Sequence, residues 1–150
     1  YQKNRFAQKI IDHLNINLED KQIGVLGWAF KKDTNDSRES ASIYIVNDLL
    51  ISGAFIKIYD PMVSSKRIKM DLITLWKLKN FSTEKIKQLF KRIKINNEIN
   101  QTIKSTHAIA ILSEWDHFKK INWDSVPKEI KVFDGRNIIK RKDNLYQIGK

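Results

Sequence analysis

Short apolar runs alternate with longer segments of helical periodicity along the first part of this chain. Ile23–Leu26 and Phe55–Tyr59 are short and mostly apolar, which predicts two strands. Apolar side chains in residues 39–52 recur at helical spacing, and Gly53 follows where a glycine commonly ends a helix. A strand, a helix and a second strand in this order predict a parallel sheet. An earlier helix is expected over residues 2–14, whose apolar stripe is Phe6, Ala7, Ile10, Ile11 and Leu14.

The second half of the chain contains further strand patterns. His107–Leu112 is nearly all apolar, as expected of a strand buried on both faces. Lys131–Phe133 predicts the next strand, and Leu145–Ile148 predicts a last one at an edge. A short helix is expected over Glu114–Lys119. The whole pattern predicts an α/β fold with a Rossmann-like parallel sheet flanked by helices.

The middle of the chain gives a weaker pattern. Ser64–Arg67 has the composition of a loop, and Leu72–Leu78 is apolar enough for a short helix or strand. Residues 83–104 are predicted to be helical, in two pieces that break near Asn96-Asn97. No function is predicted for residues 62–105, which we interpret as a variable surface excursion.

A polar loop with basic residues follows the first predicted strand. Gly27 frees the backbone to turn sharply after that strand, and Asp36 or Ser37 is expected to cap the next helix. A glycine turn, cationic side chains and a helix N-terminus together favour binding of an anionic phosphate group. The basic residues of this loop are Lys31, Lys32 and Arg38.

Ligands of open parallel sheets bind outside the carboxyl ends of the strands. Three groups are predicted to lie there: Phe30-Lys31, Glu114-Trp115-Asp116 and Asp134-Gly135-Arg136. Lys31 can meet a phosphate as a compact charge, whereas Arg136 can hold one with its planar guanidinium.

Each of these cations also has a simpler interpretation. Lys31 and Lys32 can be a solvated loop pair, and Arg136 can form a salt bridge with Asp134 or Asp143. From the chemistry of the residues alone the two interpretations are equally good. If the functional one holds, Lys31 and Arg136 converge on one diphosphate.

A complete dinucleotide site is a competing interpretation of the same unit. Asp60 ends the second predicted strand, where an acidic residue often binds a ribose hydroxyl. The glycine pattern, however, is only Gly24-x-x-Gly27, and Trp28 and Phe30 crowd the turn. We therefore interpret Asp60, which precedes Pro61, as a strand end that bonds its own loop, and Trp28 as a packing residue.

Composition narrows the function classes. The chain has 41% hydrophobic and 30% charged residues and no cysteine, which fits one soluble globular domain without disulfides or thiolate metal sites. The three histidines show no metal-ligand spacing, and no nucleophile motif is present, so we expect no metal and no catalytic residue in this chain. A formal net charge of +11 would suit a stand-alone module that binds nucleic acid or protein. The basic residues are scattered, and no apolar run could cross a bilayer, so we expect neither nucleic acid nor a membrane as partner.

Three motifs carry a resemblance to a known family: Gly27-Trp-Ala-Phe-Lys-Lys-Asp-Thr-Asn-Asp-Ser-Arg-Glu-Ser40, Ser113-Glu-Trp-Asp-His-Phe118 and Val132-Phe-Asp-Gly-Arg136. In this order they resemble the C-terminal, UDP-binding domain of the UDP-glucose/GDP-mannose dehydrogenase family. The sequence of the first motif most resembles the UDP-glucose 6-dehydrogenase branch, with the GDP-mannose and UDP-N-acetylhexosamine branches as alternatives. The resemblance implies that Phe30, Lys31 and Arg136 bind the UDP-sugar substrate and that Arg38 reaches NAD.

The resemblance also implies an NAD-dependent, two-step oxidation of UDP-glucose to UDP-glucuronate in the parent enzyme. That chemistry needs a cysteine and an N-terminal Rossmann half, neither of which this sequence contains, so the isolated chain is expected to be inactive. Residues 1–20 are expected to be the tail of an interdomain helix, and residues 21–150 the UDP-sugar-binding domain. The expected setting is cytoplasmic, with the N-terminal half as partner in a homo-oligomeric parent.

Overall fold

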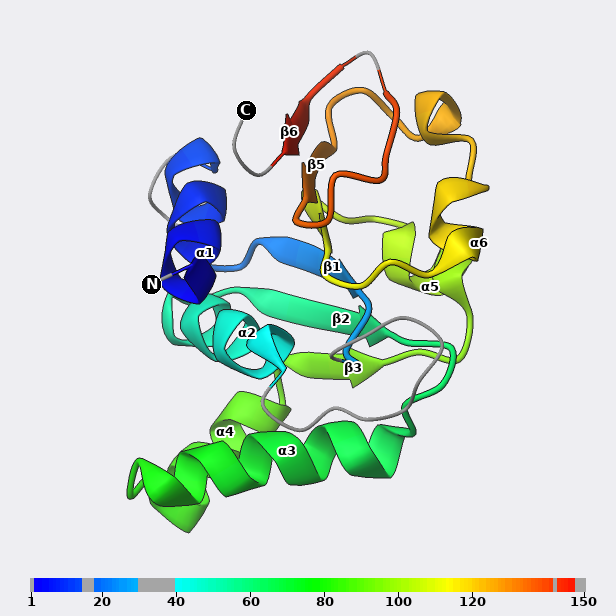
Figure 1. Ribbon diagram of the computed structural model, residues 1–150. Coiled ribbons are helices and arrows are strands. Elements are labelled where there is room, and N and C mark those ends of the chain that lie inside the picture. The colour runs from blue at the N-terminus through cyan, green and yellow to red at the C-terminus, as the bar shows by residue number, and fades with distance from the viewer. Residues whose placement is uncertain (1, 15–17, 30–39, 142, 148–150) are drawn as a thin grey trace.

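A computed structural model of the chain describes residues 2–14, 18–29, 40–141 and 143–147. Strands of the described residues pair in one parallel sheet: β1 (Gln22–Leu26), β2 (Phe55–Tyr59), β3 (Ile93–Ile95), β4 (Ala108–Ile111), β5 (Lys131–Asp134) and β6 (Leu145–Gln147). Their order across the sheet is β3-β2-β1-β4-β5-β6 (Figure 1). The prediction of a Rossmann-like parallel sheet is confirmed.

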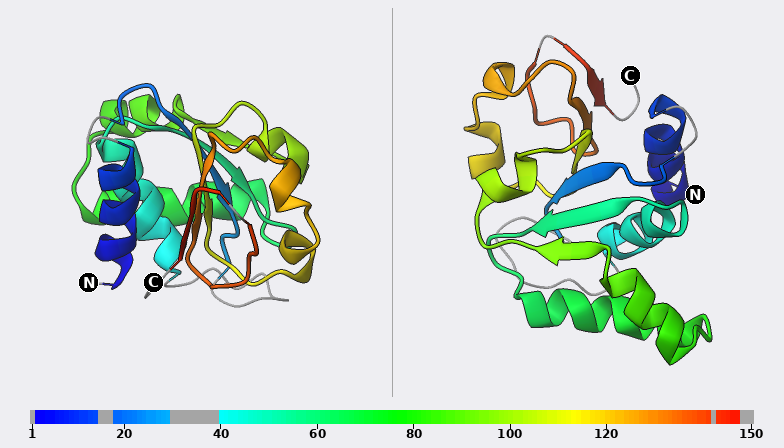
Figure 2. Two further views of the ribbon diagram at one scale, coloured as in Figure 1. Left: turned by 90° about the horizontal axis from the view of Figure 1, so that it is seen from above. Right: turned by 180° about the vertical axis from the view of Figure 1, so that it is seen from behind.

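Helices cover both faces of this sheet. Figure 2 shows α1 and α2 on one side of the sheet and α6 with the 3-10 helix η1 on the other. No helix in the described part of the chain is both long and apolar enough to cross a membrane. The helices are α1 (Gln2–His13), α2 (Ala41–Ile51), α3 (Ser65–Leu78), α4 (Thr83–Phe90), α5 (Ile99–Ile103), α6 (Asp116–Lys119) and η1 (Trp123–Ser125).

The two-residue period of the strands divides the core into two parts. Val25 of β1 belongs to the core shared with α1, α2 and α3, whereas its neighbour Leu26 belongs to the core shared with α6 and η1. Both side chains are completely buried. Successive strand residues point to opposite faces, so a strand covered on both sides has to be apolar throughout. β4 meets that requirement, since all four of its residues are buried.

The middle of the chain differs from the sequence prediction. The two expected helices of residues 83–104 are present as α4 and α5, but a strand, β3, separates them. β3 adds to the sheet edge because Ile56 N–H donates to Arg92 O at 2.8 Å and Asn96 N–H donates to Ile58 O at 2.9 Å. The predicted loop of residues 64–67 is also wrong, because α3 begins at Ser65. The hydroxyl of Ser64 caps that helix by accepting from Arg67 N–H at 3.1 Å.

The start of α2 lies later than predicted. Its N-cap is Ser40, whose Oγ accepts from Ser42 N–H at 3.2 Å, rather than Asp36 or Ser37, which lie outside the described residues. Its end is as predicted, since Gly53 has a φ of 105° and its N–H donates to Leu50 O. The helix predicted from residue 114 begins at Asp116, after the buried Trp115.

Candidate functional site

The strand order reverses between β1 and β4. From β1 the chain proceeds outward through β2 to β3, and from β4 it proceeds the other way through β5 to β6. In open parallel sheets such a reversal opens a crevice at the carboxyl ends of the two central strands. The residues that follow β1, β4 and β5 therefore meet at one edge of the sheet.

Gly27 makes the sharp turn after β1. Its φ is 102°, in the region that residues with a side chain rarely adopt, and its N–H donates to Tyr59 O at 2.8 Å. A Cβ at this position would lie 2.5 Å from the side chain of Ser113 and 2.7 Å from its backbone nitrogen. Glycine is thus required both by the backbone and by the close approach of the segment after β4. The predicted turn is confirmed.

Asp60 fastens the loop after β1 to the loop after β2. One carboxylate oxygen, Oδ2, accepts from Trp28 N–H at 2.7 Å and Ala29 N–H at 3.1 Å. The other, Oδ1, accepts from Met62 N–H at 2.8 Å and Val63 N–H at 3.0 Å. The prediction that Asp60 bonds its own loop is confirmed, but its link to β1 was missed. Because backbone donors occupy both oxygens, the carboxylate is not available to bind a ribose. This supports our rejection of a complete dinucleotide site.

Serine side chains complete this backbone framework. Ser113 Oγ, after β4, donates to Ala29 O at 2.9 Å, and Ser42 Oγ of α2 donates to Gly27 O at 3.3 Å. Ser113 and Ser42 are each about 1% exposed. These bonds hold the exits of β1 and β4 and the first turn of α2 against one another. They give the carboxyl edge a fixed backbone on which flanking side chains can be placed.

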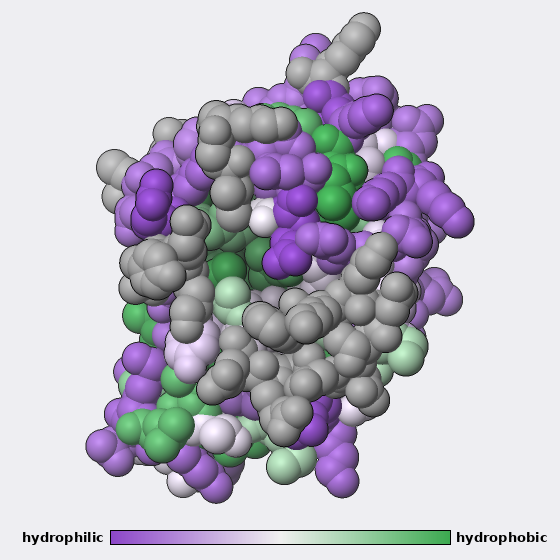
Figure 3. All heavy atoms as spheres, viewed as in Figure 1, coloured by the Kyte–Doolittle hydropathy of each residue, from purple (hydrophilic) through white to green (hydrophobic). Residues whose placement is uncertain are grey.

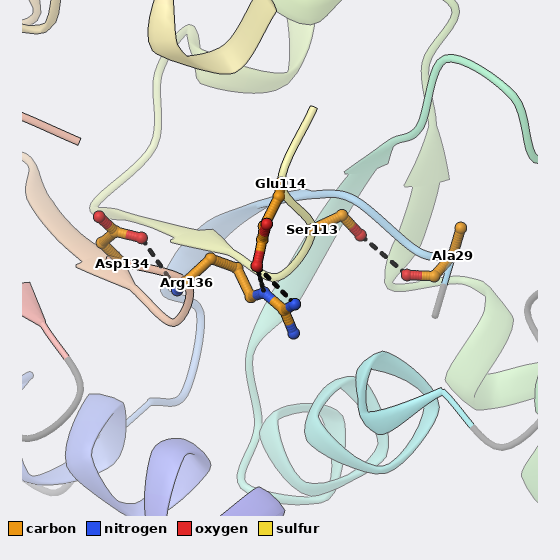
Figure 4. Close-up of polar contacts among 5 residues, drawn as sticks. All are labelled: Ala29, Ser113, Glu114, Asp134 and Arg136. Carbon is orange, nitrogen blue, oxygen red and sulfur yellow. Dashed lines mark hydrogen bonds and ion pairs between the residues drawn. The ribbon is translucent and has the colours of Figure 1, made fainter. Parts of the chain in front are cut away.

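Arg136 lies at this edge, after β5 (Figure 4). Its backbone N–H donates to Asp134 Oδ1 at 3.0 Å, and Asp134 is completely buried. Its guanidinium pairs with Glu114, which follows β4: Nε lies 3.1 Å and Nη2 lies 2.7 Å from Glu114 Oε1. The simpler interpretation named Asp134 or Asp143 as the salt-bridge partner, and the partner is in fact Glu114. Both side chains are more than a third exposed, so the pair is screened by water.

The Arg136 guanidinium has donors to spare. Nη1 makes no hydrogen bond to any residue that the structure describes, and Nη2 uses only one of its two N–H groups. Gly135 lets the chain pass close to β4, since its N–H donates to Ile111 O at 2.9 Å and a Cβ there would lie 3.0 Å from the same oxygen. Buried backbone contacts thus place an exposed, partly engaged cation at the reversal of strand order.

The other predicted ligand-binding residues belong to the loop after β1. Phe30, Lys31 and Arg38 lie outside the described residues, as does Lys32. The convergence of Lys31 and Arg136 on one diphosphate therefore stays a prediction. Trp28, which we interpreted as a packing residue, is completely buried, and its Nε1 donates to Asp71 Oδ2 of α3 at 2.9 Å.

A titratable aromatic pair lies beside this edge. Tyr59 Oη and His117 Nε2 are 3.2 Å apart, and the two rings meet edge to face. Burial lowers the pKa of His117, which opposes the weaker raising effect of Asp60. Burial, and secondarily Asp60, raises the pKa of Tyr59. Nearby Trp115 is buried, and its indole N–H has no hydrogen-bond partner among the residues that the structure describes. In the described part of the chain no group of acidic residues and histidines is arranged to hold a metal ion.

The fold and this edge define an α/β nucleotide-binding domain of Rossmann-like topology, with a cation at the mouth of the sheet. Residues 24–141 match the family model described as "UDP-glucose/GDP-mannose dehydrogenase family, UDP binding domain". The chain therefore belongs to that family.

Curated relatives agree with this family. The UDP-glucose 6-dehydrogenase of Drosophila melanogaster is 40% identical over 153 residues, and that of Bos taurus is 38% identical over 143 residues. The alignments cover 99% and 93% of this chain but only 31% and 28% of those proteins. The chain thus spans less than a third of the length of these relatives.

Solved structures show the same fold. A UDP-glucose dehydrogenase from the archaeon Pyrobaculum islandicum aligns with a TM-score of 0.70 at 23% identity, covering 97% of this chain and 29% of that one. A GDP-mannose dehydrogenase from Pseudomonas aeruginosa aligns with a TM-score of 0.62 at 18% identity, covering 95% and 31%.

Proposed function

We propose that this chain is the UDP-sugar-binding domain of an NAD-dependent UDP-glucose 6-dehydrogenase, which oxidises UDP-glucose to UDP-glucuronate in two steps. The match of residues 24–141 to the UDP binding domain of the family carries this proposal. The name of the substrate comes from relatives that are 38% and 40% identical and are called UDP-glucose 6-dehydrogenase.

Arg136 is the described residue that we assign to the diphosphate of the nucleotide-sugar. Glu114 holds two of its nitrogens, and Nη1 makes no bond to the other described residues, so one guanidinium can be positioned and still bind phosphate. The ion pair with Glu114 is worth less than about 1 kcal/mol at this exposure. Should the phosphate need both edges of the guanidinium, Glu114 can be displaced at small cost.

Residues of the loop after β1 complete the proposed site. Phe30 and Lys31 contact the UDP-sugar, and Lys31 converges with Arg136 on its diphosphate. Arg38 reaches toward NAD. What supports these assignments is their sequence position between Gly27, which turns the chain at the carboxyl edge, and Ser40, which caps α2.

The remaining parts of the reaction belong to other chain segments in this proposal. The nicotinamide cofactor is held mainly by an N-terminal Rossmann half, and the cysteine nucleophile lies in another part of the enzyme, since this sequence contains none. Residues 1–20 are the tail of the helix joining the halves, and residues 21–150 form the UDP-sugar-binding domain. We place the assembled enzyme in the cytoplasm as a homo-oligomer.

Calorimetric titration of UDP into the 150-residue chain tests the role of Arg136. Arg136→Ala removes charge-assisted hydrogen bonds worth about 1.5–3 kcal/mol, so the affinity for UDP should fall by roughly 10- to 100-fold. Glu114→Gln should bind UDP at least as well as the wild type, because it removes a negative charge and keeps a polar partner. Lys128→Gln, which changes one exposed charge away from the site, is the control. Equal UDP affinity in Arg136→Ala and Lys128→Gln contradicts the assignment.

A further inference from the structure

The positive charge of the chain is concentrated in the segment for which the sequence suggested no function. Residues 62–105 contain eleven lysines and arginines and only three acidic residues, a net charge of +8 out of +11 for the whole chain. This segment forms α3, α4, β3 and α5, and it ends the sheet on one side (Figure 1). The basic residues of α3, α4 and β3 therefore share one end of the molecule (Figure 1), whereas α5 packs against β1 and β2.

The exposed side of α3 combines these charges with apolar side chains. Lys66, Met70 and Lys77 are spaced by four and seven residues, which places them along one line of the helix. Met70 is 50% exposed, and Leu78, at the end of the helix, is 77% exposed. In Figure 3 hydrophilic and hydrophobic side chains interleave over the lower part of the molecule, where Figure 1 places α3.

The line of Lys66, Met70 and Lys77 along α3 contains no acidic residue. The only acidic residue of α3 is Asp71, and its carboxylate accepts from the buried Trp28 indole at 2.9 Å. The lysines and the arginine of α3 form no ion pair with any residue that the structure describes. A helix of 14 residues is about 21 Å long, so α3 presents an extended cationic line that includes the exposed Met70. Leu78 lies beside this line, at the end of the helix, seven residues after Asp71.

We propose that α3 docks the domain onto an anionic lipid surface, a property that goes beyond the proposed function and does not depend on it. Lysines attract the head groups of acidic lipids, while Met70 and Leu78 enter the boundary between head groups and acyl chains. The expectation that a membrane is not a partner rested on the absence of a spanning run, and peripheral docking needs no such run. Single-stranded nucleic acid fits this face less well, because the one aromatic residue of α3, Trp76, is completely buried and cannot stack on bases.

Sedimentation with lipid vesicles tests this docking. The 150-residue chain should bind vesicles of phosphatidylcholine with 30 mol% phosphatidylglycerol at about 50 mM salt, and not vesicles of phosphatidylcholine alone. Lys66→Gln/Lys77→Gln should weaken binding by about 25-fold, since each lysine near the surface contributes about fivefold. Met70→Gln/Leu78→Gln should weaken it as well with no change in net charge. Lys120→Gln/Lys128→Gln, with the same change in net charge on other elements, should bind like the wild type.

Three outcomes would overturn the proposal. The first is that the chain does not bind anionic vesicles at low salt. The second is that Lys120→Gln/Lys128→Gln weakens binding as much as Lys66→Gln/Lys77→Gln, because total charge and not this face would then be responsible. The third is that Met70→Gln/Leu78→Gln binds vesicles as the wild type does, while a DNA duplex binds with the same dependence on Lys66 and Lys77. Circular dichroism of each variant verifies that it is folded.

Discussion

Replacing Asp60 by alanine should be among the most destabilising single changes in this domain. The carboxylate accepts four backbone N–H groups, two from the loop after β1 and two from the loop after β2. Alanine removes every acceptor at once. Trp28 and Ala29 are at most 1% exposed, so water cannot readily replace the lost oxygen at their N–H groups.

The magnitude follows from the burial of the donors. A buried donor left unsatisfied costs about 1–3 kcal/mol, and two such donors give roughly 2–6 kcal/mol. Met62 is exposed and lines a pocket of 290 Å³ together with Asp60, so water can hydrate its N–H group and it adds little; Val63 N–H is buried and keeps the loss away from the lower end of this range. We therefore expect a loss of about 4 kcal/mol, which is a large part of the 5–15 kcal/mol stability of a typical domain.

Urea denaturation followed by far-ultraviolet circular dichroism measures this loss. Asp60→Asn keeps one acceptor oxygen and should lose about half as much as Asp60→Ala. Glu129→Ala, at an exposed position whose side chain makes no hydrogen bond to the described part of the chain, should stay within about 0.5 kcal/mol of the wild type. A loss below about 1 kcal/mol in Asp60→Ala would refute the reasoning, because the four bonds would then contribute almost nothing.

Three further predictions concern Gly27, His117 and the absence of cysteine. Gly27→Ala should lower the free energy of unfolding by about 3 kcal/mol or more, because it combines a φ of 102° with a clash against the Ser113 backbone. Gly53→Ala, with a similar φ of 105° but a nearest contact of 3.0 Å, should lower it less. Equal urea midpoints of the two variants would contradict this. Because burial lowers the pKa of His117, the unfolded chain binds a proton there more readily, so the stability that the neutral ring contributes is complete above about pH 6.5 and is lost as the pH falls below it. The urea midpoint of the wild type should therefore decline between pH 7 and pH 5 more than that of His117→Phe, and parallel pH profiles would count against it. The chain, which has no cysteine, should form no NADH from NAD and UDP-glucose, and steady NADH production would disprove its assignment as a binding domain alone.

Local sequence patterns were sufficient to predict the helices and strands whose buried residues recur at a regular period. β1, β2, β4 and β5 were predicted because a strand in a covered parallel sheet has to be apolar, and α1 and α2 because each buries one stripe. β3 was missed because Ile93-Lys94-Ile95 is only one alternation long and lies in a lysine-rich run with helical spacing. Its strand conformation depends on pairing with β2, which local sequence does not encode.

In the candidate site, too, some residues could be predicted from the sequence and their contact partners could not. Gly27, Asp60 and Arg136 could be selected from the sequence, because a glycine turn, an acidic strand end and a basic residue after a strand each have a local chemical meaning. Their partners could not be selected. Glu114 is 22 residues from Arg136, and Trp28 is 32 residues from Asp60.

By itself the sequence determined that this chain is an α/β domain and that its chemistry gathers after the apolar strands, since both follow from short-range periodicity and from the residues at strand ends. Only the tertiary structure decided that Glu114 holds the Arg136 guanidinium and that Asp60 joins the loops after β1 and β2. It likewise left Lys66 and Lys77 exposed on α3 while the half-buried Asp71 accepts from the Trp28 indole. These hydrogen bonds and ion pairs are about 3 Å long, and residues that are distant in sequence come within that distance only when the sheet has formed.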